Sequence, residues 1–148
     1  MVTNDSTQSL AIHLEGAIAH LRNRLREASR TNSGELSLTQ LSILKRLDRN
    51  GQQTAAQLSV CEHISQQAIA QNLVVLKAAG YVQMVTDSRD RRKLLISLTS
   101  AGRKLRESII ASRDAWLVRA IEQTLSDSEK IRLEDLLPLL ESLADASV

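Results

Sequence analysis

The stretch from Gly80 to Thr99, G-Y-V-Q-M-V-T-D-S-R-D-R-R-K-L-L-I-S-L-T, carries the clearest structural signal in this chain of 148 residues. Two runs of β-prone residues, at 81–86 and 94–98, flank a segment that contains only Asp, Ser, Arg and Lys. This pattern predicts a β-hairpin with a charged tip. Such a tip suits a phosphate backbone or a narrow DNA groove, and the alternative is an ordinary solvated turn. The candidate binding residues at the tip are Arg89, Asp90, Arg91, Arg92 and Lys93.

The positive charge of the chain is local rather than general. The formal net charge is only +2, from 19 Lys and Arg against 17 Asp and Glu. Residues 81–106 contain seven Lys and Arg against two Asp, whereas residues 121–148 contain two against seven Asp and Glu. A basic segment centred on a hairpin favours nucleic acid as a partner, and the acidic end of the chain is expected to face elsewhere.

Several classes of protein are disfavoured by what the sequence lacks. One cysteine gives no internal disulfide framework, residues 1–9 have no basic and apolar signal regions, and no apolar run approaches the roughly 18 residues that cross a bilayer. We therefore expect a cytoplasmic protein associated with the nucleoid and not a membrane protein.

Catalytic and metal-binding motifs are also missing. The sequence has no G-x-S-x-G, no H-E-x-x-H, no phosphate-binding glycine loop and no cysteine pair, so neither an enzyme nor a cofactor is expected. His13 and His20 share a helix face but lie roughly 10 Å apart, which is too far to chelate one metal ion without another segment. No metal site is predicted.

Capping signals divide the first half of the chain into four expected helices. Ser37 with Gln40 and Thr54 with Gln57 form capping boxes, and Ser65 is a good N-cap. A short helix, a tight turn and a longer helix give the spacing of a helix-turn-helix unit. The predicted helices cover residues 8–30, 37–49, 54–60 and 66–79, with a break at 31–34.

The helix at 66–79 has two different faces. Ile69, Leu73 and Leu76 form a stripe that is expected to be buried. Glutamine can bond N6 and N7 of adenine together, and alanine or valine can touch a thymine methyl, so the opposite face is suited to A·T-rich sequence in a major groove. The alternative is an ordinary solvent-facing surface. The candidate DNA-binding residues of this helix and its entrance are Ser65, Gln66, Gln67, Ala70, Gln71 and Val74.

Two more helices are expected after the hairpin. Thr99 is a good cap for a helix through about Leu125, and Ser126 with Glu129 opens a final leucine-rich helix that Pro138 should bend or interrupt. A terminal helix this apolar requires a partner surface. We expect the first and last helices to form the interface of a homodimer.

At this point the residues resemble a known family, the multiple antibiotic resistance regulator (MarR) family of bacterial and archaeal transcription factors. The sharpest part is Asp87-x-x-Asp90-Arg91-Arg92, followed by Leu95-Ile96-Ser97-Leu98-Thr99 and Gly102, which is similar to the family's wing signature. Leu38-Thr39-Gln40 and Leu76-x-x-x-Gly80-Tyr81-Val82 match further landmarks, and the resemblance covers nearly the whole chain.

The resemblance implies a mainly α fold with a small β-hairpin wing (α+β), a winged helix-turn-helix domain at 35–99 and a helical dimerisation region at 1–34 and 100–148. It implies two recognition helices in successive major grooves of a pseudo-palindromic operator, with double-stranded DNA as the partner. Arg92 matches the wing arginine that enters the minor groove, held by Asp90, and the alternative is that Arg92 only braces the hairpin. By the same resemblance, Arg91 is expected to contact a phosphate. The family contains more repressors than activators, and small, often aromatic, anionic effectors bind a crevice where Arg22 and Arg26 are candidates to meet them.

Two alternatives stay open. The helix at 66–79 has no Lys or Arg before Lys77, which favours weaker DNA binding or a winged-helix protein-interaction module. Cys61 lies in the turn before that helix, where oxidation would give a redox-sensing repressor, although a plain turn residue is the simpler interpretation. His63 is a further candidate for phosphate contact or mere exposure.

Overall fold

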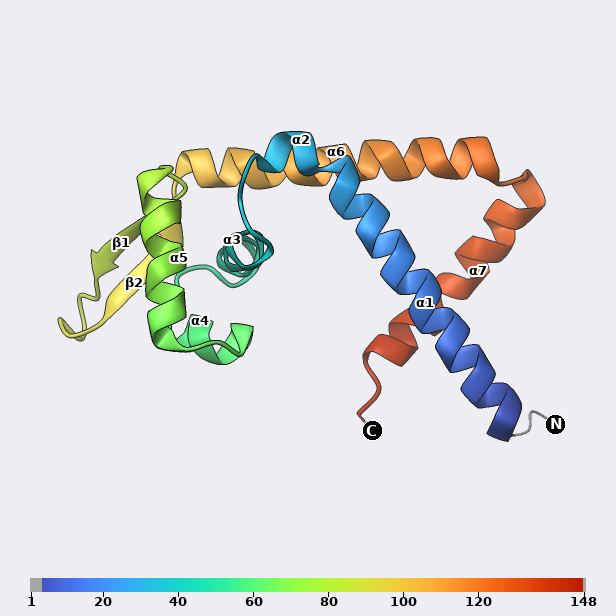
Figure 1. Ribbon diagram of the computed structural model, residues 1–148, viewed down its shortest axis with the longest axis horizontal. Coiled ribbons are helices and arrows are strands. Elements are labelled where there is room, and N and C mark those ends of the chain that lie inside the picture. The colour runs from blue at the N-terminus through green and yellow to red at the C-terminus, as the bar shows by residue number, and fades with distance from the viewer. Residues whose placement is uncertain (1–3, 148) are drawn as a thin grey trace.

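The computed structural model describes residues 4–147 of the chain. Helix α6 runs along the molecule, with the hairpin, α4 and α5 at one end and α1 and α7 at the other (Figure 1). The elements are α1 (Asn4–Ala28), α2 (Arg30–Ser33), α3 (Leu38–Asn50), α4 (Ala55–Glu62), α5 (Gln66–Ala78), β1 (Val82–Thr86), β2 (Leu94–Leu98), α6 (Ser100–Thr124) and α7 (Asp127–Ala144).

Side-chain caps start most of these helices where the sequence predicts them. The capping boxes at the starts of α3 and α4 are formed, each with a hydroxyl residue and a Gln three positions later. At the start of α7, the Glu129 carboxylate accepts from the backbone N and the hydroxyl of Ser126. Ser65 accepts a hydrogen bond from the backbone N of Ala68 at 3.1 Å, and Thr99 accepts one from Gly102 at 3.1 Å. Each cap satisfies backbone N–H groups that a helix start leaves unpaired.

One apolar core joins α3, α4, α5 and the hairpin. Burial of these aliphatic side chains is the main stabilising contribution to this half of the molecule. The predicted stripe of Ile69, Leu73 and Leu76 lies within it, as expected. The buried members are Ile43, Leu44, Leu47, Leu58, Ile69, Leu73, Leu76, Val82, Ile96 and Leu98.

The hairpin is antiparallel and in the expected position. Val82 pairs with Leu98 and Thr86 with Leu94, so residues 87–93 form the tip. Its base is anchored by burial of Val82, Ile96 and Leu98. A bridge that the sequence did not indicate joins Gln53 to Ile96, and their backbone N and O atoms exchange hydrogen bonds of 2.8 and 3.0 Å. This bridge connects the entrance of α4 to the hairpin.

The expected break at 31–34 is wrong, because α2 occupies residues 30–33 after a bend at Ser29. The Ser29 hydroxyl donates to the Arg26 carbonyl at 3.0 Å and accepts from Arg113 Nε at 3.3 Å, with Ser29 fully buried. Asn32 bonds the Ser112 hydroxyl as well. Contacts with α6 therefore keep this polar segment helical, until Gly34 ends it with φ of 60°.

Other boundaries differ by a few residues. Helix α1 begins at Asn4 instead of Gln8, and α4 extends to Glu62 instead of ending near Val60. Pro138 does not interrupt α7, which is continuous through it. Proline removes one backbone donor and places its ring against the preceding turn. Within residues 4–147, α7 has no buried residue, so no packing partner prevents the helix from adjusting around the ring.

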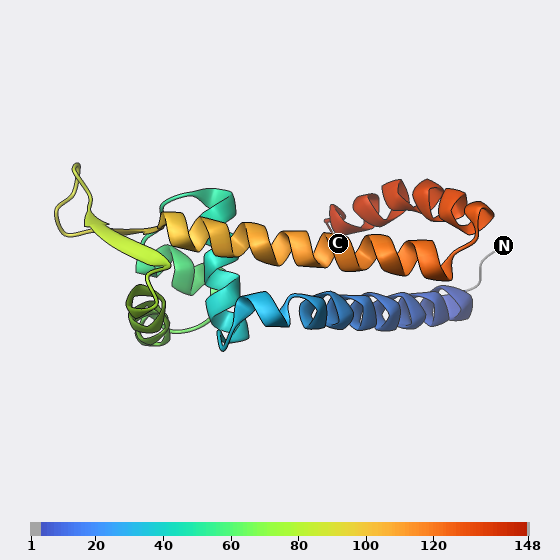
Figure 2. The ribbon, with the colours of Figure 1, turned by 90° about the horizontal axis from the view of Figure 1, so that it is seen from above.

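The helices at the far end leave much apolar surface exposed. Viewed from above, α1 and α7 lie to either side of α6 (Figure 2). Leu10, Ile12 and Ile18 of α1 are half or more exposed, and so are Ile131, Leu136, Leu139 and Leu143 of α7. Within residues 4–147, no helix is both long enough and apolar enough to span a membrane.

The close approach of α6 to the hairpin gives a stability prediction. A Cβ at Gly102 would overlap the carbonyl oxygen of Tyr81, which is backbone and cannot rotate away. We expect Gly102→Ala to lower the free energy of unfolding by about 1–3 kcal/mol, measured by urea denaturation.

Gly16→Ala is the matched control. Gly16 lies inside α1, and apart from its chain neighbours and the local backbone of its own helix, no described atom lies within 4 Å of a Cβ built there. The control should raise stability by about 0.5–1 kcal/mol through helix propensity. Equal effects of the two changes would contradict the steric explanation.

Candidate nucleic-acid interface

The turn between α4 and α5 is fixed by local hydrogen bonds. His63 adopts the left-handed conformation with φ of 55°, the only non-glycine residue among those described with a positive φ. The Ser59 hydroxyl donates to the Ile64 carbonyl at 2.6 Å, and the Ile64 N–H donates to the backbone carbonyl of Ser59 at 3.3 Å. These bonds fix the three-residue connection 63–65, so α5 begins at a defined angle to α4.

A second set of contacts joins the end of α4 to α3. Arg46 donates from Nε to the Glu62 carboxylate and from Nη2 to the Cys61 carbonyl at 2.6 Å. The Ser42 hydroxyl donates to the same Glu62 oxygen at 2.9 Å. The carboxylate accepts from two donors and only 10% of the Glu62 side chain is exposed. Sequence reasoning missed this network because its partners are up to 20 residues apart and no local pattern pairs them.

The predicted reading face of α5 is solvent-exposed. Gln66, Gln67, Ala70, Gln71 and Val74 are all exposed, while the opposite stripe is buried in the core. Ser65 sits at the entrance, where its hydroxyl oxygen is already used as the N-cap. Any phosphate contact from Ser65 must therefore use its remaining hydroxyl proton, beside the positive end of the helix dipole.

The hairpin tip is organised by two aspartates. Asp87 accepts from the backbone N of Arg89 at 2.9 Å, and Asp90 accepts from the backbone N of Arg92 at 3.1 Å. Asp90 also accepts from Arg92 Nε at 3.2 Å, so the expected Asp90–Arg92 pair is formed. The Arg92 side chain is 92% exposed, which leaves its outer nitrogens available to an anion. The tip therefore presents a cation in a preset direction.

Ionisation favours the same geometry. The backbone and side-chain hydrogen bonds from Arg92 hold the pKa of Asp90 below its usual value. The carboxylate is thus ionised at neutral pH, where it accepts both bonds. Protonation at acid pH would remove the charge that orients Arg92.

Of the two residues that the sequence placed in this turn, only His63 lies there, and it is exposed. The position expected for Cys61 is wrong, because α4 extends to Glu62 and includes it; Cys61 is half-buried there as a free cysteine. The Cys61 carbonyl accepts a hydrogen bond from Arg46, so the backbone of Cys61 has a structural role. A redox role for its thiol stays a prediction. Among residues 4–147, no group of three metal-ligating side chains comes together.

A cationic cavity of about 470 Å³ lies where α1, α3 and α6 meet. The candidate effector residues Arg22 and Arg26 both line it, joined by Lys45, Arg106 and Arg113. Leu25, Leu38 and Leu41 supply its apolar part. Arg106 and Arg113 come from α6 and were not identified from the sequence, because the amphipathic pattern of α6 did not show which arginines turn inward.

A core of three helices, an antiparallel hairpin, an exposed helix face of amide and small side chains, and a basic hairpin tip define a winged helix-turn-helix transcriptional regulator. A family model described as the MarR family matches residues 35–93. The chain is 30% identical over 143 residues to an uncharacterized HTH-type transcriptional regulator of Mycobacterium bovis, covering 97% of this chain and 98% of that protein. The protein belongs to the MarR family.

Solved structures show the same fold. A transcriptional regulator protein from Pseudomonas aeruginosa has a TM-score of 0.84 and 32% identity, covering 98% of this chain and 99% of that one. A MepR variant from S. aureus, solved bound to an oligodeoxyribonucleotide, has a TM-score of 0.69 and 20% identity, covering 90% and 97%. The expected fold class and family are confirmed, and the relatives are regulators rather than enzymes.

The Arg46–Glu62 pair gives a testable energy. Arg46→Met leaves the largely buried Glu62 carboxylate without its cation, so we expect a loss of about 2 kcal/mol in the free energy of unfolding. Glu62→Met should have a similar effect. The double variant should lose clearly less than the sum, because it leaves neither charge unpaired. Additive losses in urea denaturation would show that the two side chains do not interact.

Proposed function

We propose that two copies of this chain bind a pseudo-palindromic, A·T-rich operator and repress transcription in the cytoplasm until a small effector releases them. The observation that carries this proposal is the exposed reading face of α5 beside a hairpin tip whose Arg92 is oriented by Asp90. The oligonucleotide-bound MepR relative supports it by fold likeness.

The two surfaces would read DNA in different ways. Gln67 and Gln71 are one turn apart on α5 and have the groups to bond adenine in a major groove, while Ala70 and Val74 suit thymine methyls. Arg92 would enter the adjacent minor groove, where narrow A·T-rich sequence concentrates negative potential. Arg89, Arg91 and Lys93, exposed on the same tip, would contact phosphates.

The distribution of charge predicts the salt dependence. Because α5 has no cation before Lys77, phosphate contacts come mainly from the hairpin tip. Each phosphate contact contributes about 0.9 to the slope of log K against log salt concentration. We therefore expect a shallower slope than for a winged helix-turn-helix protein whose recognition helix also carries cations. Specificity then depends on the amide side chains.

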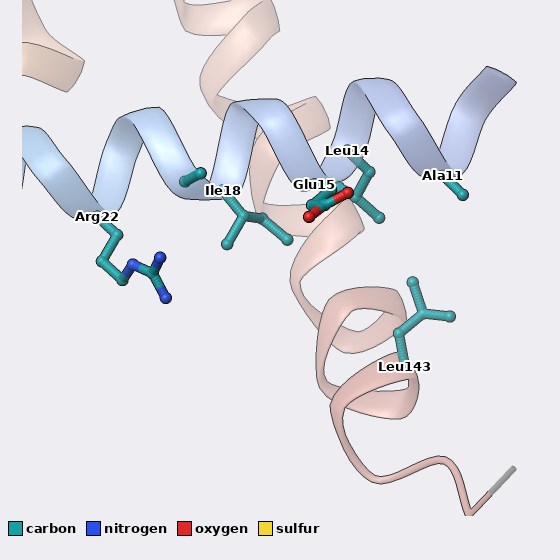
Figure 3. A pocket seen from close by; sticks show the side chains of 7 residues that line it. Ala11, Leu14, Glu15, Ile18, Arg22 and Leu143 are labelled. Carbon is teal, nitrogen blue, oxygen red and sulfur yellow. The ribbon is translucent and has the colours of Figure 1, made fainter.

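Dimerisation is supported by the apolar surfaces of α1 and α7. A trough of about 440 Å³ between them is lined by Ala11, Leu14, Ile18 and Leu143, with Glu15 and Arg22 at its polar positions. Figure 3 shows Leu143 of α7 pointing toward the α1 side chains across this trough. Exposed aliphatic side chains on both helices are stabilised only when another surface covers them, at about 25 cal/mol per Å² buried. A second copy provides such a surface.

The effector would occupy the cationic cavity between α1, α3 and α6. This cavity is bounded by α1 from the proposed dimerisation region and α3 from the DNA-binding part, so a bound ligand would contact both. A ligand with different affinity for two arrangements of these parts shifts their populations.

Two other functions remain as alternatives on specific observations. The uncharged start of α5 favours a winged-helix module that binds protein instead of DNA, and such a module would be indifferent to duplex DNA. A redox-sensing repressor acting through Cys61 would lose operator binding on peroxide treatment and would keep it in a Cys61→Ser variant.

The operator proposal is tested by selection from a random duplex pool at near-physiological salt. We expect enrichment of an A·T-rich pseudo-palindrome. Arg92→Ala should weaken binding to all selected sequences, whereas Gln71→Ala should relax preference at one base pair per half-site by about 1–3 kcal/mol.

Arg132→Ala is the control, because Arg132 is an exposed cation on α7, far along the chain from the reading surfaces. If the folded protein enriches no sequence, the result would favour the alternative of a winged-helix module that binds protein instead of DNA. Unchanged titrations for both Arg92→Ala and Gln71→Ala would overturn the assignment of the reading residues.

The dimer is tested by sedimentation velocity. Wild-type protein should sediment as a dimer, and the double change Leu139→Glu with Leu143→Glu should give monomers, because charges replace two exposed leucines of α7. Ser128→Glu adds charge to the same helix without removing apolar surface and should leave the dimer intact. A monomeric wild type would rule out the interface.

A further inference from the structure

The cationic cavity has an unusual lining for an aromatic effector. Five cations line it, and among the described residues no carboxylate and no aromatic side chain does so. The whole sequence contains one Trp, one Tyr and no Phe, so no aromatic stacking surface is available there. The chemistry of the wall favours charge neutralisation over ring stacking.

Two of the cations, Arg106 and Arg113, belong to α6, and the one carboxylate paired with either of them among the described residues is that of Asp48. Arg106 is 6% exposed and forms an ion pair with Asp48, with Nε and Oδ2 3.5 Å apart, although its Nε has no hydrogen-bond partner among the described residues. Arg113 donates to Ser29 at 3.3 Å, and burial, followed by the charge of Arg106, lowers its pKa. Two neighbouring positive charges, of which one carboxylate neutralises only one, are costly to hold together, and an anion in the cavity would offset their repulsion.

The positive surface continues along α3. Ser42 and Lys45 also line a neighbouring cavity of about 360 Å³, whose other walls are Arg46, Arg49 and Asn50. Ser42 and Arg49 are two helical turns apart, which is roughly 10 Å. The two cavities share Ser42 and Lys45 and together are lined by seven cations, of which Arg46 and Arg106 are paired with the Glu62 and Asp48 carboxylates.

We propose that these joined cavities bind an anion that carries several phosphate or carboxylate groups, rather than an aromatic monoanion. One charged group would lie at Arg106 and Arg113 and another at Lys45 and Arg49. Binding itself is independent of the operator, and only its effect on DNA rests on the proposed function.

The position of Arg46 gives the anion a route to the reading helix. Arg46 lines the second cavity and also binds the Glu62 carboxylate and the Cys61 carbonyl at the end of α4. An anion beside Arg46 competes with Glu62 for its guanidinium group. Loss of those bonds would free the end of α4 and change the angle at which α5 is presented.

The test is isothermal titration calorimetry on the full chain without DNA, with tripolyphosphate, citrate, orthophosphate and benzoate as probes. At least one of tripolyphosphate and citrate should bind about tenfold more tightly than both orthophosphate and benzoate, since a second charged group should contribute on the order of 1.4 kcal/mol. The tighter of the two assigns phosphate or carboxylate groups to the ligand.

Variants locate the binding. Lys45→Gln and Arg49→Gln, both at exposed positions, should each weaken that probe about threefold. Lys104→Gln, an exposed lysine outside both cavities, should have no effect. Arg92→Ala should also have no effect, which separates the cavities from the proposed DNA surface.

Two results would overturn the proposal. One is benzoate binding as tightly as the multiply charged probes. The other is binding that survives Lys45→Gln and Arg49→Gln but is lost in Arg92→Ala, which would place the anion on the hairpin tip. Failure of operator selection alone would leave the calorimetry unaffected, so the two proposals are judged separately.

Discussion

The contact between the first turn of α6 and the base of the hairpin determines how the rest of the molecule is arranged. The Tyr81 carbonyl accepts the Thr99 N–H at 3.0 Å, and Gly102 packs so closely on the same carbonyl that a side chain has no room. The Thr99 hydroxyl donates to the Gly80 carbonyl, where α5 ends. This single junction sets the direction of α5, the hairpin and α6 relative to one another. The orientation of the candidate DNA surface relative to α1 and α7, at the other end of α6, therefore depends on it.

Much of this arrangement is predictable because its causes are local. Caps at Ser37, Thr54 and Ser65 act within three residues, and the hairpin follows from alternating β-prone runs around a polar tip. The exposed face of α5 follows from the helical period once its buried stripe is known. The Asp90–Arg92 pair could also be predicted from the sequence, since its members are two residues apart.

The features that sequence reasoning missed depend on contacts between distant segments. Helix α2 persists through a polar segment because Arg113 and Ser112, about 80 residues later, bond Ser29 and Asn32. Arg106 and Arg113 look like ordinary surface cations until α1 and α3 enclose them. Contacts between residues far apart in the chain produce no repeating pattern in the sequence. Neither the Arg46–Glu62 network nor the full charge of the cavity could therefore be predicted from residue spacing.

The unbroken length of α6 has a mechanical consequence. Its 25 residues, Ser100–Thr124, form a helix roughly 37 Å long, so it acts as a lever between the two ends of the molecule. A tilt of about 5° at one end displaces the other by about 3 Å, close to the axial rise of one base pair, whereas half-sites repeat every 34–36 Å or so. In the proposed dimer, small angular changes between the two copies of α6 would therefore be enough to align the two copies of α5 with successive major grooves or to misalign them.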